Sequence, residues 1–370
     1  MREKEILDSC YKKAEETLLK CATKYGLYAS GGKKAYKGVW ARDSVISLIG
    51  ASAAKDRKEF KEQFQKSLIT LEKYQSKHGQ IANAVLHLDA KKPQVDYLSI
   101  DSTLWFIIGE LIYKRRYEPS LHKAHRVSIK KAMTWLGYQD IGEEILLEQL
   151  PTTDWQDAFP HKYGRTLNTQ ALYYHVLNLS ERIKEAEKLR HLVNENEGTK
   201  LWNEEFYFAY RWKNHGKYKE IGEWFDSLGN LLAIIFELAT REHALKILEY
   251  IKKKKINEPY PVKAIFPPIR PGDKEWKDYF LDCDAGQPYH YLNAGVWPYI
   301  GGFYVLALVK VRKFKEAQEE LLKLANANLK GNFPEWINPI TKGVHGRLQA
   351  WNAGMYIAAY ESLRHKRVMI

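Results

Sequence analysis

The hydrophobic pattern of the chain is mainly helical. Apolar residues recur three and four positions apart over most of its length, the spacing that places them on one face of a helix. Alternating patterns are few, and FYFAYRW at 206–212 is the best strand candidate, as one arm of a short hairpin that turns at NHGK. We predict eleven helices, with a further short one near 196–204, at approximately 3–24, 42–54, 57–76, 99–115, 119–136, 167–191, 223–238, 241–254, 292–310, 313–327 and 348–364.

The predicted helices differ in sequence, and no internal repeat recurs along the chain, which disfavours a solenoid with a uniform motif. About twelve dissimilar helices are better explained by an all-α fold, a closed double ring whose loops converge on a central funnel. No Gly/Ser-rich or Pro-rich linker divides the chain, so we expect one domain over residues 1–370. The segment 256–276 carries five prolines and indicates a long ordered loop, a kind that is commonly functional.

The charge balance is basic. Lys and Arg number 58 against 45 Asp and Glu, which gives a net charge of +13 and a pI near 9.3. The lysines are spread along the chain, and the longest basic run, KKKK at 252–255, ends a helix pattern, where cations complement the helix dipole. No zinc-finger, KH or RRM pattern accompanies it. We therefore favour a solvated lysine-rich surface over a nucleic-acid partner.

The remaining composition excludes several classes of protein. The three cysteines, Cys10, Cys21 and Cys283, include no CxxC pair, which indicates neither a disulfide framework nor a zinc site and favours a reducing compartment. No signal-peptide core opens the chain, and no apolar run is long enough for a membrane span. We expect a cytoplasmic protein. The GxSxG, GxxxxGK[ST], HExxH and GxGxxG motifs are absent, so we expect neither a metal nor a cofactor.

Two distant motifs place a carboxylate among aromatic residues and prolines, LPTTDWQD at 150–157 and FPEW at 333–336. Two carboxyl groups brought together by the fold are what glycosidic bond cleavage needs, because one must be a protonated acid and the other an ionised base or nucleophile. Taken singly, Asp157 is better explained as a helix cap or loop aspartate, and Glu335 as an ordinary loop glutamate. As a pair, they make a glycoside hydrolase the working interpretation.

Five sequence blocks strengthen this interpretation because they occur in a fixed order. They are GVWARDSVISLIG at 38–50, VDYLSIDSTLWFIIG at 95–109, TTDWQDAFPHKYGRTLNTQALYYHVL at 152–177, YLNAGVWPYIGGF at 291–303 and FPEWINPITKGVHGRLQAWNAGMYIAAYESL at 333–363. Together they resemble the glucosidase domain of glycogen-debranching enzymes, the amylo-α-1,6-glucosidases, over most of the chain. They are less closely similar to the neutral or alkaline invertases and more distantly to the trehalases. The resemblance implies an (α/α)6 barrel and the hydrolysis of glycosidic bonds.

The resemblance also implies roles for the two carboxylates. Asp157 matches the general acid of the family's WMD motif, with Gln156 in place of Met, and Glu335 matches the general base. The apolar neighbours of Asp157, including Trp155, would raise its pKa and keep it protonated, as an acid requires. Asp154 is the rival acid.

Other residues are candidates for sugar binding. The resemblance implies that Arg42 and Asp43, beside Trp40, hydrogen-bond the terminal sugar, a task that suits a guanidinium and a carboxylate facing vicinal hydroxyls. The alternative is an N-cap aspartate with an exposed arginine. Tryptophans at loop positions suit stacking on pyranose rings, and Asp101 either lines the site or caps the following helix. The further candidates are Asp101, Asp154, Trp155, Trp297 and Trp336.

We predict an inverting, exo-acting hydrolase that binds a terminal glucose in a blind pocket, with its carboxyl groups about 6.5–9.5 Å apart. Debranching enzymes usually carry a further domain that recruits the polymer, for which this chain has no room. An invertase- or trehalase-like hydrolase of a disaccharide or small glycosyl solute is therefore the first alternative. A catalytically inactive barrel that binds carbohydrate or a protein partner is the second. The linkage and the anomeric outcome stay open, and a homodimer is only a general expectation.

Overall fold

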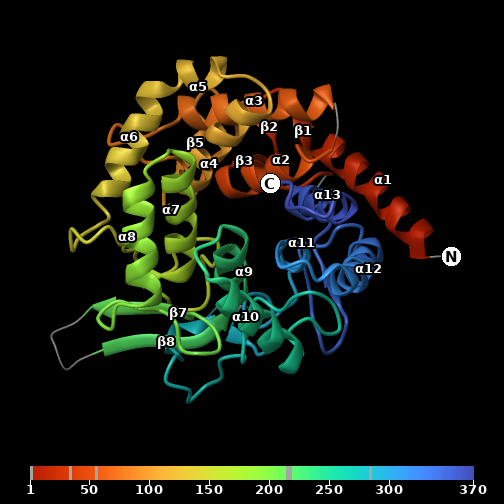
Figure 1. Cartoon of the computed structure of the whole chain (residues 1–370). Coiled ribbons are helices and arrows are strands. Elements are labelled where there is room, and N and C mark those ends of the chain that lie inside the picture. The colour runs from red at the N-terminus through yellow and green to blue at the C-terminus, as the bar shows by residue number, and fades with distance from the viewer. Residues whose placement is uncertain (1–2, 33–35, 55–56, 214–218, 283–285) are drawn as a thin grey trace.

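The structure, a computed structural model, describes residues 3–32, 36–54, 57–213, 219–282 and 286–370. Within these ranges, six helices form a closed inner ring, in which each helix packs against the next and the last returns to the first (Figure 1). The predicted (α/α)6 barrel is thereby confirmed. The inner helices are α2 (Ala41–Ala51), α4 (Asp101–Arg116), α7 (Leu167–Leu179), α9 (Ser227–Ile235), α11 (Pro298–Lys310) and α13 (Ala350–Arg364).

An outer layer of helices covers this ring. Outer helices bury one face only, as in α10, where Ala244, Ile247, Leu248 and Ile251 point inward, whereas inner helices such as α2 are buried all round. No helix in the described part of the chain combines the length and the apolar character needed to cross a membrane. The outer helices are α1 (Glu3–Cys21), α3 (Lys58–Lys73), α6 (Arg126–Gly137), α8 (Ile183–Asn194), α10 (Arg241–Lys253) and α12 (Phe314–Gly331), with the short α5 (Ser120–Ala124) beside α6.

The connections of the two rings differ in length at the two ends of the barrel. Short turns such as 180–182 and 311–313 lead from an inner helix to the next outer one. Each return to an inner helix is a long segment, so all the long segments gather where the inner helices begin. They span residues 22–40, 74–100, 138–166, 195–226, 254–297 and 332–349.

These long segments contain all the strands of the described residues and the 3₁₀ helix η1 (Asp278–Asp282), and every strand pairing is antiparallel. The largest sheet has the order β6-β7-β8-β9. The strands are β1 (Ala22–Thr23), β2 (Gly26–Leu27), β3 (Gly38–Trp40), β4 (Ala84–Leu86), β5 (Gln94–Asp96), β6 (Arg165–Thr166), β7 (Phe208–Lys213), β8 (Lys219–Asp226), β9 (Ile265–Phe266), β10 (Trp336–Ile337) and β11 (Val344–His345).

Several predicted element boundaries were wrong. The helix expected over 167–191 is the pair α7 and α8, because the chain turns at Glu181, whose φ of 60° lies in the left-handed region. The helix expected over 119–136 is divided into α5 and α6, and no helix covers 196–204. The helix expected from 223 starts only at Ser227, since the preceding residues pair as β8. The strand at 206–212 is confirmed as β7, paired with β8, while its NHGK turn lies outside the described residues.

Two glycines permit the ring to close. A Cβ on Gly50 would lie 2.3 Å from the carbonyl oxygen of Gly354, and a Cβ on Gly354 would lie 2.2 Å from that of Ser47. The backbones of α2 and α13 therefore approach more closely than any side chain would allow. This contact joins the first and last inner helices.

Candidate active site

A cavity of about 80 Å³ lies where the inner helices begin. That volume holds several water molecules. Seven of the ten site residues predicted from the sequence line it, and the long segments before α2, α7, α11 and α13 bring them together. The lining consists of Ala29, Tyr36, Trp40, Arg42, Asp43, Trp155, Asp157, Tyr291, Trp297, Glu335 and Trp351.

Local structure places three of these residues at the start of α2. Strand β3 pairs with β4 and runs directly into the helix, so that Trp40 is the N-cap residue, without a side-chain capping bond. Arg42 and Asp43 follow in the first turn, and both are buried. The alternative of a capping Asp43 beside an exposed arginine is therefore wrong. The helix N-terminus favours the Asp43 carboxylate, yet burial raises the pKa of this group to about 6 against the lowering effect of Arg42.

Asp101 lies behind the cavity wall and holds Arg42 in place. Its Oδ1 accepts a hydrogen bond from Nη1 of Arg42 at 2.8 Å and one from the Ser99 hydroxyl. The side chain is fully buried and lines no part of the cavity. Helix α4 begins at Asp101 itself after Ile100, so the N-cap alternative is also wrong. The structure thus places Asp101 as a support for Arg42 rather than in contact with a ligand.

The loop before α7 separates the two rival acids. Asp157 lines the cavity, and its side chain is exposed to solvent, while the density of protein atoms around the carboxyl group is high. Burial raises its pKa, and the positive charge of Arg42 opposes this shift. Asp154 is fully excluded from solvent and lies 3.0 Å from the ammonium of Lys162. Only Asp157 is placed to meet a ligand in the cavity.

Glu335 reaches the same cavity from the segment between α12 and α13. Its backbone N–H donates to the carbonyl oxygen of His345, which ties it to the hairpin of β10 and β11. Gly346, at a φ of 66°, packs so closely that a Cβ there would lie 2.7 Å from the Cβ of Glu335. Burial raises the pKa of Glu335 to about 7, and the negative charge of Asp43 adds to the shift. The hydroxyl of Tyr36, 3.3 Å from Oε1, lowers it.

The aromatic residues of the cavity form a connected group. The rings of Trp155 and Trp297 meet edge to face with centroids 5.6 Å apart, and Trp297 contacts Trp351 in the same manner at 5.8 Å. The indole N–H groups of Trp40, Trp155 and Trp351, and the Nε of Arg42, are buried without a hydrogen-bond partner among the described residues. Buried donors normally have partners, so these groups are available to acceptor oxygens of water or of a ligand.

Trp336 is not part of the cavity wall. Its ring is buried and stacks on His345 with centroids 3.9 Å apart. Sequence reasoning also missed Tyr36 and Tyr291, which do line the cavity. The chain has 24 tyrosines, and no spacing distinguishes these two from the others.

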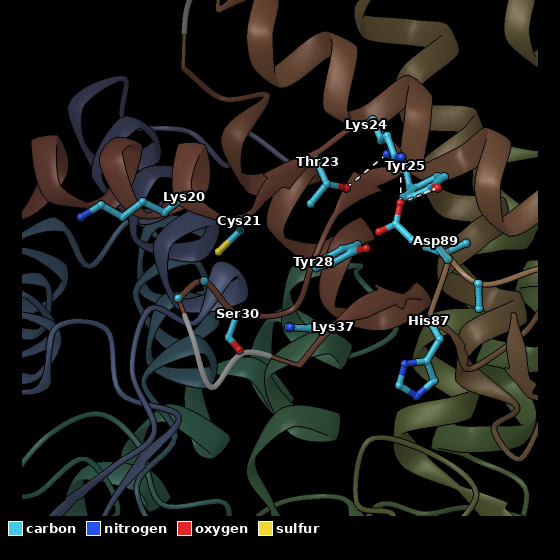
Figure 2. A pocket seen from close by; sticks show the side chains of 14 residues that line it. Lys20, Cys21, Thr23, Lys24, Tyr25, Tyr28, Ser30, Lys37, His87 and Asp89 are labelled. Atoms are coloured by element: carbon cyan, nitrogen blue, oxygen red, sulfur yellow. Dashed lines mark hydrogen bonds and ion pairs between the residues drawn. The ribbon is translucent and has the colours of Figure 1, made fainter.

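A larger hollow of about 730 Å³ is lined by Ser30 and Lys37, among other residues (Figure 2). The backbone N–H of Tyr36 donates to the hydroxyl of Ser30, which lines this hollow. Its single acidic residue, Asp89, is 2.7 Å from Lys24 and also accepts from Tyr25 (Figure 2). Asp43, Asp157 and Glu335 line the smaller cavity together, whereas the larger hollow has Asp89 alone, so the smaller cavity is the candidate active site. Within the described residues, no three His, Cys, Asp or Glu side chains are grouped to hold a metal ion.

Comparison by sequence finds similarity in the second half of the chain. Residues 220–365 match the family model of alkaline and neutral invertases. The chain is 30% identical over 142 residues to neutral/alkaline invertase 1, mitochondrial, of Oryza sativa subsp. japonica, a match that covers 36% of this chain and 22% of that protein. It is 28% identical over 144 residues to alkaline/neutral invertase E, chloroplastic, of Arabidopsis thaliana, again with 36% and 22% covered. The chain therefore matches about a fifth of the length of these relatives.

Comparison by structure extends over nearly the whole chain. The GH63 mannosylglycerate hydrolase of Thermus thermophilus, in complex with Tris and D-glycerate, superposes with a TM-score of 0.68 and 12% identity, covering 94% of this chain and 99% of that one. A wild-type glycosidase superposes with a TM-score of 0.67 and 14% identity, covering 97% and 98%. The chain thus has the helical barrel fold of these glycosidases and, over residues 220–365, sequence similarity to the alkaline and neutral invertases.

Proposed function

We propose that this chain is a glycoside hydrolase in which Asp157 is the general acid and Glu335 the general base. The observation that carries the proposal is the meeting of these two carboxyl groups, from distant segments, in one cavity lined by tryptophans. Their environments support the division of roles. Burial raises the pKa of both groups, and the hydrogen bond from Tyr36 favours the ionised form of Glu335 alone.

The reaction follows from these positions. Asp157 donates its proton to the glycosidic oxygen while the bond from that oxygen to the anomeric carbon breaks. Glu335 takes a proton from a water molecule, whose oxygen forms the new bond to the anomeric carbon from the opposite face. The products are the sugar with inverted configuration and the alcohol of the leaving group. Asp157 ends as a carboxylate and Glu335 as a carboxylic acid, and proton exchange with solvent restores both.

The remaining lining residues suit the recognition of a sugar ring. Arg42 presents a donor and Asp43 an acceptor at adjacent positions, which fits neighbouring hydroxyl groups. The unpartnered indole N–H groups of Trp40, Trp155 and Trp351 would find acceptors in the oxygens of a sugar. Tryptophan faces stack on the apolar faces of pyranose rings. No cofactor takes part in this scheme.

The first candidate substrate is sucrose. The match to alkaline and neutral invertases over residues 220–365 favours it, and this segment contains Glu335 and Trp297. A pKa near 7 for the base also agrees with work at neutral to alkaline pH, since a general base must be ionised. The second candidate is an α-1,6-linked glucoside, favoured by the ordered blocks that resemble amylo-α-1,6-glucosidases.

A substrate panel separates the candidates. The purified protein would be assayed on sucrose, trehalose, isomaltose, panose, maltotriose, a limit dextrin and glucosylglycerate, with Asp157→Asn as control. Hydrolysis of sucrose that is lost in the variant supports the invertase assignment, whereas hydrolysis of isomaltose or panose supports the debranching type. Proton NMR of the first sugar released tests inversion. Absence of hydrolysis across the panel would overturn the proposal in favour of an inactive carbohydrate-binding barrel.

A further inference from the structure

A fully buried lysine lies behind the cavity wall, beside the loop that carries Asp157. The ammonium of Lys162 is 3.0 Å from Oδ2 of Asp154 and 2.9 Å from Oδ2 of Asp226, and all three side chains are excluded from solvent. It also donates to Oε1 of Gln156. One cation therefore faces two carboxylates and an amide oxygen inside the protein. None of these groups lines the cavity.

These contacts tie both flanks of Asp157 to the inner ring. Asp154 and Gln156 precede Asp157 in the chain and Lys162 follows it, so the contacts of Lys162 close the loop on itself. The backbone N–H of Gln156 donates to Oδ1 of Asp154, which adds a second closure. Asp226 belongs to another element, since it is the N-cap of α9 and accepts from the N–H of Gly229. The ammonium thus fastens the loop to the start of an inner helix.

Stability by itself is a weak reason for such an arrangement. Replacing a buried ion pair or triad by apolar side chains of similar volume is often neutral or stabilising, because desolvation offsets the attraction between the charges. A proton donor, in contrast, must be held within a fraction of an ångström of its productive position. Lys162, Asp154 and Asp226, which we call the triad, are placed to supply that constraint without entering the cavity.

We propose that Lys162 is a positioning residue, which holds Asp157 in place for proton donation through its contacts with Asp154, Gln156 and Asp226. This inference rests on the proposed hydrolase function and deepens it. Lys162 touches neither the cavity nor a substrate within it, and so it acts only through the loop.

The triad also keeps a negative charge close to the acid. Burial lowers the pKa of Lys162, but the charges of Asp154 and Asp226 outweigh this effect and the pKa is raised, so the ammonium persists. For Asp157, burial is the main cause of the raised pKa, Arg42 opposes it, and the charge of Asp154 adds to it. The charged or titratable groups that act on Asp157 from all sides are Tyr36, Arg42, Asp43, Asp101, Asp154, Tyr291 and Glu335.

The first test is Lys162→Met, which removes the charge and keeps much of the length. With the panel substrate that the wild-type protein hydrolyses fastest, we expect kcat to fall by about 10²-fold. We expect KM to change by less than about threefold, and the affinity for glucose, measured by calorimetry, to be unchanged. The reason is that Arg42 and Asp43 are not altered, and we expect their contacts to stabilise the bound substrate and the transition state equally. A wild-type kcat in Lys162→Met would overturn the inference while leaving the hydrolase function intact.

A double variant separates positioning from simple charge balance and also covers a single variant that fails to fold. Lys162→Met with Asp226→Asn restores the net charge of the triad, and asparagine still caps α9. We expect this protein to fold and bind glucose but to keep the low kcat. Recovery of the wild-type kcat would show that Lys162 only neutralises charge, and would overturn its positioning role.

Two further variants complete the design. Asp154→Asn removes a negative charge that raises the pKa of Asp157. The alkaline limb of the pH profile of kcat/KM should therefore move to lower pH. An unmoved limb would contradict the effect of Asp154 on the pKa of Asp157. Lys263→Met is the matched control, because the ammonium of this buried lysine donates to the carbonyl oxygens of Lys255 and Glu258 and does not line the cavity. The Lys263→Met protein should be less stable than the wild type but should keep the wild-type kcat. An equal loss of kcat in Lys263→Met and Lys162→Met would overturn the inference. A wild-type protein silent on the whole panel would overturn the hydrolase function itself.

Discussion

The hydroxyl of Tyr36 lies 3.3 Å from Oε1 and 3.4 Å from Oε2 of Glu335, two residues that are far apart in the chain. Tyr36 comes from the segment before α2, and Glu335 from the segment before α13. The contact therefore spans the place where the inner ring closes. Because a donor stabilises the ionised form of a carboxyl group, Tyr36 holds the pKa of Glu335 lower than burial alone would set it.

Tyr36→Phe should consequently move the acid limb of the pH profile. Without the hydroxyl, the pKa of Glu335 rises further above about 7, so the ionised base is present only at higher pH. We expect the acid limb of kcat/KM to move upward by up to about one pH unit. Tyr25→Phe, which removes a hydroxyl bonded to Asp89 in the neighbouring hollow, is the control and should leave the limb unchanged. A downward movement in Tyr36→Phe would contradict the role of Glu335 as base.

Replacement of either proposed catalytic carboxylate should abolish most turnover. General acid or base catalysis contributes about 10²–10⁴-fold, and we expect Asp157→Asn and Glu335→Gln each to lower kcat by about 10³-fold. Glucose binding should remain measurable by calorimetry, since Arg42, which we propose to contact the sugar, is unchanged in both variants. The control is Asp89→Asn, an aspartate at the same end of the barrel that does not line the cavity. Near wild-type turnover in both variants would contradict the assignment.

Glu335 should also destabilise the folded protein at high pH. Its pKa is 4.5 in an unfolded chain and about 7 in the folded one, so the native state retains the proton that the unfolded state loses between these values. The free energy of unfolding therefore falls as the pH rises from 4.5 to 7. At about 1.36 kcal/mol per pKa unit, the penalty reaches about 3 kcal/mol above about pH 7.

Glu335→Gln should remove this penalty. We expect the variant to be more stable than the wild type by up to about 3 kcal/mol at about pH 8, and equally stable at about pH 4, in urea denaturation. Glu319→Gln, at an exposed position of α12, serves as the control and should show no such pH dependence. An equal stability of Glu335→Gln and wild type at both pH values would show that Glu335 is not held in a desolvating environment.

The closure of the inner ring should be sensitive to a single methyl group. Gly354→Ala would place a Cβ 2.2 Å from the carbonyl oxygen of Ser47, and backbone atoms cannot rotate away as a side chain could. We expect a loss of about 1–3 kcal/mol or more in the free energy of unfolding. Gly137→Ala, at the end of α6, adds a Cβ with no atom within 4 Å and should be neutral or slightly stabilising. Equal stability of the two variants would contradict the close approach of α2 and α13.

Sequence periodicity was sufficient for the all-helical class and for most of the helices, while the (α/α)6 barrel followed from the resemblance of the ordered blocks. The spacing of apolar residues reports which face of a helix is buried, and this property depends mostly on near neighbours in the chain. It failed where two helices follow one another with only a turn between them, as at Glu181, because the apolar pattern continues across the break. It failed again before Ser227, where strand pairing across the β7–β8 hairpin replaced the expected helical turn.

By itself, the sequence determined two of the segments that meet at the cavity, since Asp157 and Glu335 stand in recognisable aromatic and proline contexts. Only the tertiary structure decided which neighbouring side chains face the cavity. Asp101 and Asp154 lie behind its wall, each against a cation, while Tyr36 enters the lining from a segment without a motif. The positioning role proposed for Lys162 could be inferred only from its contacts in the folded chain. The physical reason is that burial and ion pairing depend on residues such as Asp226, which meet only when the ring closes, and local pattern does not encode those contacts.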